Sequence, residues 1–236
     1  MQLFFHSDAK HPSQQLVFDK EESRHIIKVL RKNTGDILNI TNGLGSFFTS
    51  EIETANHNKC VVKLLAKTQQ QPLPYELHLA VAPTKLNDRY EWFLEKATEI
   101  GVTEITPVFC DHSERTKIKP ERYEKILQSA MKQSLKAFLP QLNKAVSFSE
   151  FIAMQAQNSC QKYIAHCAQG EKHSFKQALK PKEDVLILIG PEGDFALPEI
   201  ELALNNNFTP VSLGESRLRT ETAAIVACHS IAFVNE

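Results

Sequence analysis

A run of five apolar residues, Val-Leu-Ile-Leu-Ile at Val185–Ile189, narrows the possible folds more than any other segment of this 236-residue sequence. A strand that is apolar on both faces is typical of a parallel sheet covered by helices on both sides. Strand-like and helix-like runs alternate before and after it, as in α/β proteins. We therefore expect strands at 77–82, 104–109, 162–165, 185–189 and 210–213, and helices at 88–100, 120–138, 197–204 and 220–233.

The segment before residue 70 has a different pattern. An amphipathic helix is expected at 21–32, with Gly35 as its C-terminal cap. Turn residues separate three short strand-like runs, which lie at 37–40, 46–52 and 60–65. The polar, proline-bearing stretch 69–74 lacks periodicity and is typical of a linker. Two domains are therefore predicted, a small β-barrel-like unit at 1–70 and an α/β domain at 74–236.

Composition excludes several classes of protein. With 42% hydrophobic and 23% charged residues, the chain is an ordinary soluble globular protein. No apolar run approaches a membrane span, and the start lacks the pattern of a signal peptide, so we expect a cytoplasmic protein without a membrane partner. The five cysteines include no CxxC pair, which favours reduced thiols and makes a metal site unexpected.

The net charge of −1 argues against strong non-specific binding to nucleic acid. Positive charge is nevertheless concentrated locally, with eight Lys or Arg against four Asp or Glu between 111 and 144. A second, smaller cluster consists of Lys28, Arg31 and Lys32. Such clusters are usually solvated faces, and they become RNA candidates only where another feature points to RNA.

Glycine-bearing loops follow two of the expected strands. Ligands of open α/β sheets bind outside the carboxyl ends of the strands. Glycine there serves either a tight turn or a close approach of the backbone to a flat ligand, and two such loops together favour a ligand site. Neither loop has the dinucleotide, P-loop or serine-hydrolase pattern. The residues after the three relevant strands are His166, Gly190-Pro191-Glu192-Gly193 and Gly214.

The start of the expected last helix contains an unusual cation. Thr220 suits an N-cap, and Glu221 suits the first turn, where the helix dipole favours a carboxylate. Arg219 stands at the end of the dipole that disfavours a cation. It is better explained if it faces an anion such as a phosphate or a carboxylate.

Six short motifs are distributed along the whole chain: Leu188-Ile189-Gly190-Pro191-Glu192-Gly193, Leu213-Gly214, Leu218-Arg219-Thr220-Glu221-Thr222-Ala223, His25-Ile26-Ile27-Lys28-Val29-Leu30-Arg31, Lys96-Ala97-Thr98-Glu99-Ile100-Gly101-Val102 and Ile105-Thr106-Pro107. Together they resemble one family, the RsmE family of 16S ribosomal RNA uracil-N3 methyltransferases in the SPOUT superfamily. The resemblance implies a PUA-like β-barrel followed by an α/β domain with a trefoil knot, and a homodimer. One departure is clear: after Gln133-Ser134 the family has Gly-Arg, where this chain has Leu135-Lys136.

The resemblance also implies functional roles. S-adenosyl-L-methionine is the expected cofactor and the 16S rRNA of the small ribosomal subunit the expected partner, without a metal. Arg219 is expected to steer a phosphate or stabilise the imide anion, and Glu221 to act as a base or to cap the helix. Cofactor contacts are expected from His166, Ile189, Gly190, Pro191, Glu192, Gly193, Leu213, Gly214, Glu215, Leu218, Thr220, Thr222 and Ala223. RNA contacts are expected from His25, Lys28, Arg31, Lys32, Arg115, Lys117, Lys119, Arg122 and Lys136.

Two other functions remain open at this stage. A different SPOUT enzyme that methylates ribose or another base would use the same cofactor site. A non-catalytic RNA-binding assembly factor would keep the fold with a vestigial pocket. The complete glycine loops and Arg219 count against the second alternative.

Overall fold

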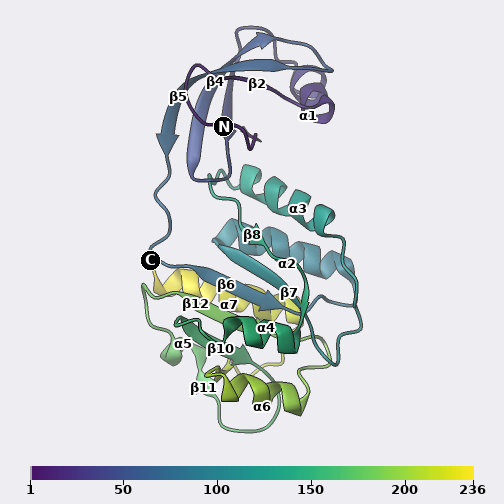
Figure 1. Ribbon diagram of the computed structural model, residues 1–236, viewed down its shortest axis with the longest axis vertical. Coiled ribbons are helices and arrows are strands. Elements are labelled where there is room, and N and C mark those ends of the chain that lie inside the picture. The colour runs from purple at the N-terminus through teal and green to yellow at the C-terminus, as the bar shows by residue number, and fades with distance from the viewer. Residues whose placement is uncertain (1) are drawn as a thin grey trace. The chain divides into compact units, whose positions relative to one another are not determined.

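The computed structural model describes residues 2–236, which form two compact units (Figure 1). The first unit contains the residues up to Pro72 together with Gln128–Leu139. The second contains Leu73–Leu127 and Pro140–Glu236. The first unit therefore includes a segment from the middle of the chain, in addition to its N-terminal part.

The first unit is built on a five-stranded sheet with the order β1-β3-β4-β5-β2. Inward residues alternate with outward ones along β4, as expected for a strand with one buried face. The inward side chains form a core that includes Phe4, Ile40, Phe48 and Val62. The strands are β1 (Leu3–Phe5), β2 (Gln15–Val17), β3 (Ile37–Thr41), β4 (Ser46–Thr54) and β5 (Val61–Gln69).

The single helix before β3 ends earlier than predicted. It begins as α1 (Lys20–Arg24), with Asp19 as its N-cap, and continues as a π-helical turn, η1 (His25–Val29). Arg31 then adopts a left-handed conformation, φ +56°, while the Lys32 amide donates to the Ile26 carbonyl at 3.1 Å. The prediction that Gly35 caps this helix is therefore wrong, because Arg31 reverses the chain first.

Helix α3 (Pro120–Gln133) is also shorter than the predicted 120–138. Leu135 takes φ +57°, its amide donates to the Lys132 carbonyl at 3.3 Å, and the Lys136 amide donates to the Met131 carbonyl at 3.1 Å. This pair of bonds is a Schellman motif, whose left-handed position favours glycine because glycine has no Cβ. Leu135 occupies that position here, which explains why a glycine suits it in the family signature.

The second unit is a parallel sheet with the order β11-β13-β10-β12-β6-β7-β8, and β9 pairs with β7. All five predicted strands of this domain are confirmed to within a residue or two, and β12 is buried along its whole length. The strands are β6 (Leu77–Val81), β7 (Glu104–Phe109), β8 (Gln141–Leu142), β9 (Val146–Ser147), β10 (Gln161–Ala165), β11 (His173–Ser174), β12 (Val185–Ile189) and β13 (Thr209–Ser212).

Helices cover both faces of this sheet (Figure 1). On one face, α4 (Phe148–Gln155) and α6 (Leu197–Asn205) share a core with alternate residues of β6 and β12. On the other face, α2 (Asn87–Ile100) packs against α7 (Thr220–Val234), which also contacts β6 and β12. The short helix α5 (Phe175–Ala178) follows β11. The predicted α/β architecture is confirmed, and α7 begins close to the end of β12.

Candidate active site

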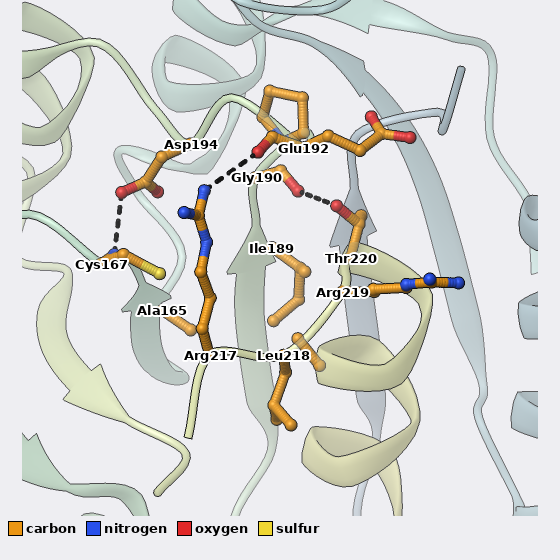
Figure 2. Close-up of a pocket in the computed structure, with 12 residues that line it drawn as sticks. Ala165, Cys167, Ile189, Gly190, Glu192, Asp194, Arg217, Leu218, Arg219 and Thr220 are labelled. Carbon is orange, nitrogen blue, oxygen red and sulfur yellow. Dashed lines mark hydrogen bonds between the residues drawn. The ribbon is translucent and has the colours of Figure 1, made fainter. Parts of the chain in front are cut away.

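Two adjoining cavities open at the carboxyl ends of β10 and β12, beside the loop that joins β13 to α7. Figure 2 shows the smaller of the two. Their volumes are about 260 and 460 Å³. They share several wall residues, including Ala165, Cys167, Asp194, Leu218 and Ala223. The larger one lies within the range of about 300–1,000 Å³ typical of small-molecule sites.

Most of the residues predicted to contact a cofactor line these cavities. The smaller cavity is lined by Ile189, Gly190, Pro191, Glu192, Leu218, Arg219, Thr220 and Ala223. The larger is lined by His166, Leu213, Gly214, Glu215, Leu218 and Ala223. Gly193 and Thr222 lie outside both walls. Gly193 instead lies close to His112. A Cβ atom added to Gly193 would stand 3.1 Å from the Cβ of His112.

The two glycines at the cavity are required for different reasons. A Cβ on Gly190 would stand 3.0 Å from the ring of Phe195, so a side chain at this position would require the ring to shift. Gly214 has φ +139°, a conformation that other residues rarely adopt, and no protein atom lies within 4 Å of the place where its Cβ would project. The backbone at Gly214 is therefore open to close approach by a ligand.

Thr220 joins the start of α7 to the loop after β12. The prediction that it is the N-cap is wrong, because Arg219 holds that position and makes no capping side-chain hydrogen bond. Thr220 is the first helical residue, and its Oγ1 donates to the Gly190 carbonyl at 3.0 Å (Figure 2). This bond fixes the distance between the two loops that bound the smaller cavity.

Several residues of the cavity walls were not singled out from the sequence, among them Asp194, Cys167 and Arg217. Asp194 has φ +65°, and its carboxylate accepts from the Cys167 amide at 2.8 Å. The Arg217 side chain lies across the cavity and approaches the Glu192 carbonyl at 3.5 Å (Figure 2). Only one signal in the sequence pointed to Arg217: it is a second cation in the same loop as Arg219.

His166 lies at the end of β10, and its Nδ1 is buried without a hydrogen-bond partner among residues 2–236. Burial lowers the pKa of this imidazole, and the nearby Lys172 ammonium lowers it further. The Lys172 ammonium donates to the His166 and Ala168 carbonyls, at 3.2 and 2.7 Å. His166 therefore brings a buried ring nitrogen without a partner to the wall of the larger cavity.

Arg219 and Glu221 border a separate hollow next to the smaller cavity, together with Arg89, Trp92 and Thr222. The exposed Arg219 side chain points away from Arg217 (Figure 2). Glu221 is buried; its Oε1 lies 3.7 Å from the Arg89 Nε, and its Oε2 has no hydrogen-bond partner in the described chain. The two predicted catalytic residues are thus close together in the chain, but the Arg219 side chain is exposed and the Glu221 side chain is buried.

The predicted RNA contacts fall into two groups in the structure. In the second unit, Arg115 donates to the Thr84 and Lys85 carbonyls and Arg122 is paired with Glu91, so both of these cations have structural partners. The other group lies at the surface: Lys28, Arg31, Lys117 and Lys119 are exposed, and His25, Lys32 and Lys136 are partly exposed.

Within residues 2–236, no three His, Cys, Asp or Glu side chains are grouped as metal ligands would be. No helix in the same range combines the length and apolarity that crossing a membrane requires.

The chain is similar to known RNA methyltransferases in both sequence and fold. The RNA methyltransferase domain family matches residues 71–232, and the RNA methyltransferase PUA domain matches residues 18–65. Ribosomal RNA small subunit methyltransferase E of Buchnera aphidicola is 32% identical over 90% of this chain and 86% of its own. A probable rRNA-methyltransferase of Porphyromonas gingivalis has a TM-score of 0.91 and 42% identity, over 100% of this chain and 98% of that one. A Legionella pneumophila protein solved with bound SAM has a TM-score of 0.88 and 29% identity, over 99% and 97% of the two chains.

Proposed function

Because the chain belongs to the ribosomal RNA small subunit methyltransferase E family, with a PUA-like domain before its methyltransferase domain, we propose that it methylates N3 of a uridine in 16S rRNA, using S-adenosylmethionine. The observation that carries the proposal is the pair of cavities between the loops that follow β10, β12 and β13. They combine exposed backbone at Gly214 with polar side chains.

The residues of the cavities fit S-adenosylmethionine. Open backbone at Gly214 suits a flat adenine, and the free Nδ1 of His166 offers a hydrogen bond. Arg217 supplies a cation for the carboxylate of the methionine part. These residues, together with the loop at Gly190, would hold the cofactor without a metal.

The bound cofactor supplies a methyl group that its sulfonium has already activated. The protein has to align the base, since positioning is a major part of catalysis in such transfers. Uracil N3 lies on the Watson–Crick edge, so the base must be unpaired when it enters the site. Arg219, exposed beside the smaller cavity, is assigned to the phosphate or to the imide anion that forms as N3 loses its proton.

Glu221 and water are the two candidate acceptors of the N3 proton. Glu221 has an unpartnered carboxylate oxygen, but that oxygen is buried, and the other oxygen faces Arg89. If Glu221 accepts the proton, Glu221→Gln abolishes methyl transfer and leaves cofactor affinity unchanged. If water accepts it, the variant keeps most of its turnover rate.

The remaining features of the proposal concern architecture. We assign the domain boundary to the linker at 69–74. We assign the trefoil knot to the loops 190–195 and 214–219. The hydrogen bond from Thr220, which follows the second loop, to the Gly190 carbonyl links these two loops. A cytoplasmic homodimer is proposed, with α2 and α7 in the interface. Its support is apolar surface on the outer sides of these helices, where Trp92 is 44% and Phe233 66% exposed.

The test combines cofactor binding with methyl transfer. Titration calorimetry with S-adenosylmethionine is expected to show binding that EDTA does not change. Small subunits from bacteria that lack the modification are expected to accept one labelled methyl group each in their 16S rRNA. Absence of binding at millimolar cofactor favours the assembly-factor alternative, and label on ribose favours a different SPOUT enzyme.

A further inference from the structure

The first unit contains a groove of its own, of about 350 Å³, far along the sequence from the loops of the cofactor cavities. Its walls come from β1, from the helix that begins at Lys20, and from the end of α3. Every residue that lines it belongs to the first unit. It is therefore a cavity separate from the one assigned to methyl transfer.

The polar groups of this groove match the edge of a nucleobase. Gln2, His25, Ser129 and Gln133 line it, and their amide, imidazole and hydroxyl groups both donate and accept hydrogen bonds. The Gln2 and His25 side chains already lie within 3.4 Å of each other. Nucleobases present alternating donors and acceptors, which such side chains read.

The charges inside the groove cancel. The Lys132 ammonium lies 3.2 Å from a carboxylate oxygen of Glu22, and both side chains line the groove. A lone phosphate or metal ion would meet an ion pair there rather than a net charge. A neutral ligand with polar edges and an apolar face is the better match, since Leu135 supplies apolar surface in the groove.

Leu135 gives an independent reason to assign a function to the groove. It lines the groove from the left-handed position of the Schellman motif, where a non-glycine residue costs about 1–2 kcal/mol. Leu135 is 41% exposed, so a large part of it is open to a ligand in the groove. Positions with a strained backbone are frequent at binding sites.

Positive charge lies next to the groove along the chain. Lys28 and Arg31 are exposed and follow His25 within six residues. They suit the phosphates that flank a bound base, because phosphate contacts position RNA while base contacts specify it. The groove thus combines a neutral pocket with cations beside it.

We propose that this groove binds one unpaired base of the 16S rRNA, other than the base that is methylated. This inference rests on the proposed function, because it takes ribosomal RNA as the substrate. The bound base selects the substrate, and the second unit carries out the transfer. Leu135 contributes an apolar surface for the face of the base, and the polar side chains contact its edge.

The first test fills the groove. Ser129 is exposed on α3, so Ser129→Trp is expected to fold. It should raise the Kd for small subunits lacking the modification, and for protein-free 16S rRNA, by about tenfold to a hundredfold, the range for loss of one stacked base. Ser129→Ala, which leaves the groove open and removes only one hydroxyl, should raise Kd clearly less than Ser129→Trp does. Asn58→Trp, at an exposed turn outside the groove, is the matched control.

The second test separates binding from stability. Leu135→Gly removes the strain together with the apolar contact, so its Tm should be unchanged or up to about 3 °C higher while RNA affinity falls. A merely structural role for Leu135 predicts no loss of affinity. Cofactor affinity, measured by calorimetry, should remain the same in every variant.

The outcomes distinguish the two proposals. If the wild-type protein methylates small subunits and Ser129→Trp binds RNA like Asn58→Trp, the groove proposal is overturned and the function stands. If affinity depends on the groove but no methyl group is transferred, the function is overturned and the groove stands. If Ser129→Trp loses affinity for small subunits only, and binds protein-free rRNA normally, the groove takes a ribosomal protein, which also overturns the proposal.

Discussion

The two units differ at particular positions where the backbone is restricted. At the cavities of the second unit, Gly190 lies against Phe195 and Gly214 has φ +139°, although Asp194 there also adopts a positive φ. At the two helix ends of the first unit, the left-handed positions are Arg31 and Leu135. The backbone is therefore open to a ligand at Gly214, whereas these two helix ends keep long side chains at the surface in spite of a positive φ. This contrast fits a cofactor held mainly by backbone and an RNA contacted mainly by side chains.

The largest effect is expected at Arg219, which would act through its side chain rather than through its backbone. Arg219→Ala should bind the cofactor normally and lose about 100-fold or more in single-turnover methylation, the scale for removing a charge-stabilising donor. Arg219→Lys should recover only part of the rate, since an ammonium does not reproduce the guanidinium fork. An unchanged rate with a higher RNA requirement would show that Arg219 only positions the substrate.

Gly190→Ala tests whether space, rather than φ, restricts the cavity loop. The added methyl group stands 3.0 Å from the Phe195 ring, so we expect a loss of about 1–3 kcal/mol in the free energy of unfolding. Phe195→Leu in the same chain should restore part of this loss. The same second change should not rescue Gly214→Ala, whose cost comes from φ +139°. Equal rescue of both variants, measured by urea unfolding, would contradict the distinction.

Thr220→Val removes the hydrogen bond between α7 and the Gly190 carbonyl and keeps the shape of the side chain. The expected loss is about 0.5–1.5 kcal/mol in the free energy of unfolding, with weaker cofactor binding by calorimetry. Thr222→Val, two residues along the same helix and outside both cavities, is the matched control. Equal effects of the two substitutions would show that the bond does not organise the cavity.

The smallest effect concerns Arg31. Arg31→Gly should raise the free energy of unfolding by about 0.5–1 kcal/mol because glycine adopts positive φ freely. Arg24→Gly, inside α1, should lower it by about 1 kcal/mol. Arg31→Gly should also reduce the slope of RNA affinity against salt by about one. If Arg31→Gly lowers the free energy of unfolding as much as Arg24→Gly does, the positive φ of Arg31 does not destabilise the first unit.

The sequence predicted the main strands and helices because their patterns are local. Val185–Ile189 is apolar on both faces, and β12 is indeed the fully buried centre of the sheet. Helix ends were less predictable: Gly35 and Thr220 are standard capping residues, yet Arg31 and Arg219 occupy the positions predicted for them. Helix α4 was missed although Ser147 and Glu150 form a capping box, a signal that the sequence contained.

Within the candidate site, the glycine loops were predictable and their partners were not. Gly190 and Gly214 stand at strand ends, where a sequence pattern marks them. Asp194, Cys167 and Arg217 reach the cavity only because three loops from separate strands converge, and no spacing in the sequence encodes that convergence. The groove of the first unit could not be predicted from the sequence either, because residues near positions 2, 25 and 133 line it together only in the folded chain.

The identity of the methylated nucleoside tests the central claim most directly. Small subunits lacking the modification are incubated with the purified protein and S-adenosylmethionine, and their 16S rRNA is digested to nucleosides for mass spectrometry. The account predicts 3-methyluridine, close to one per subunit, and none when Arg219→Ala replaces the wild-type protein at the same time point. A 2′-O-methylated nucleoside, a methylated base other than uracil, or no methylation would contradict it.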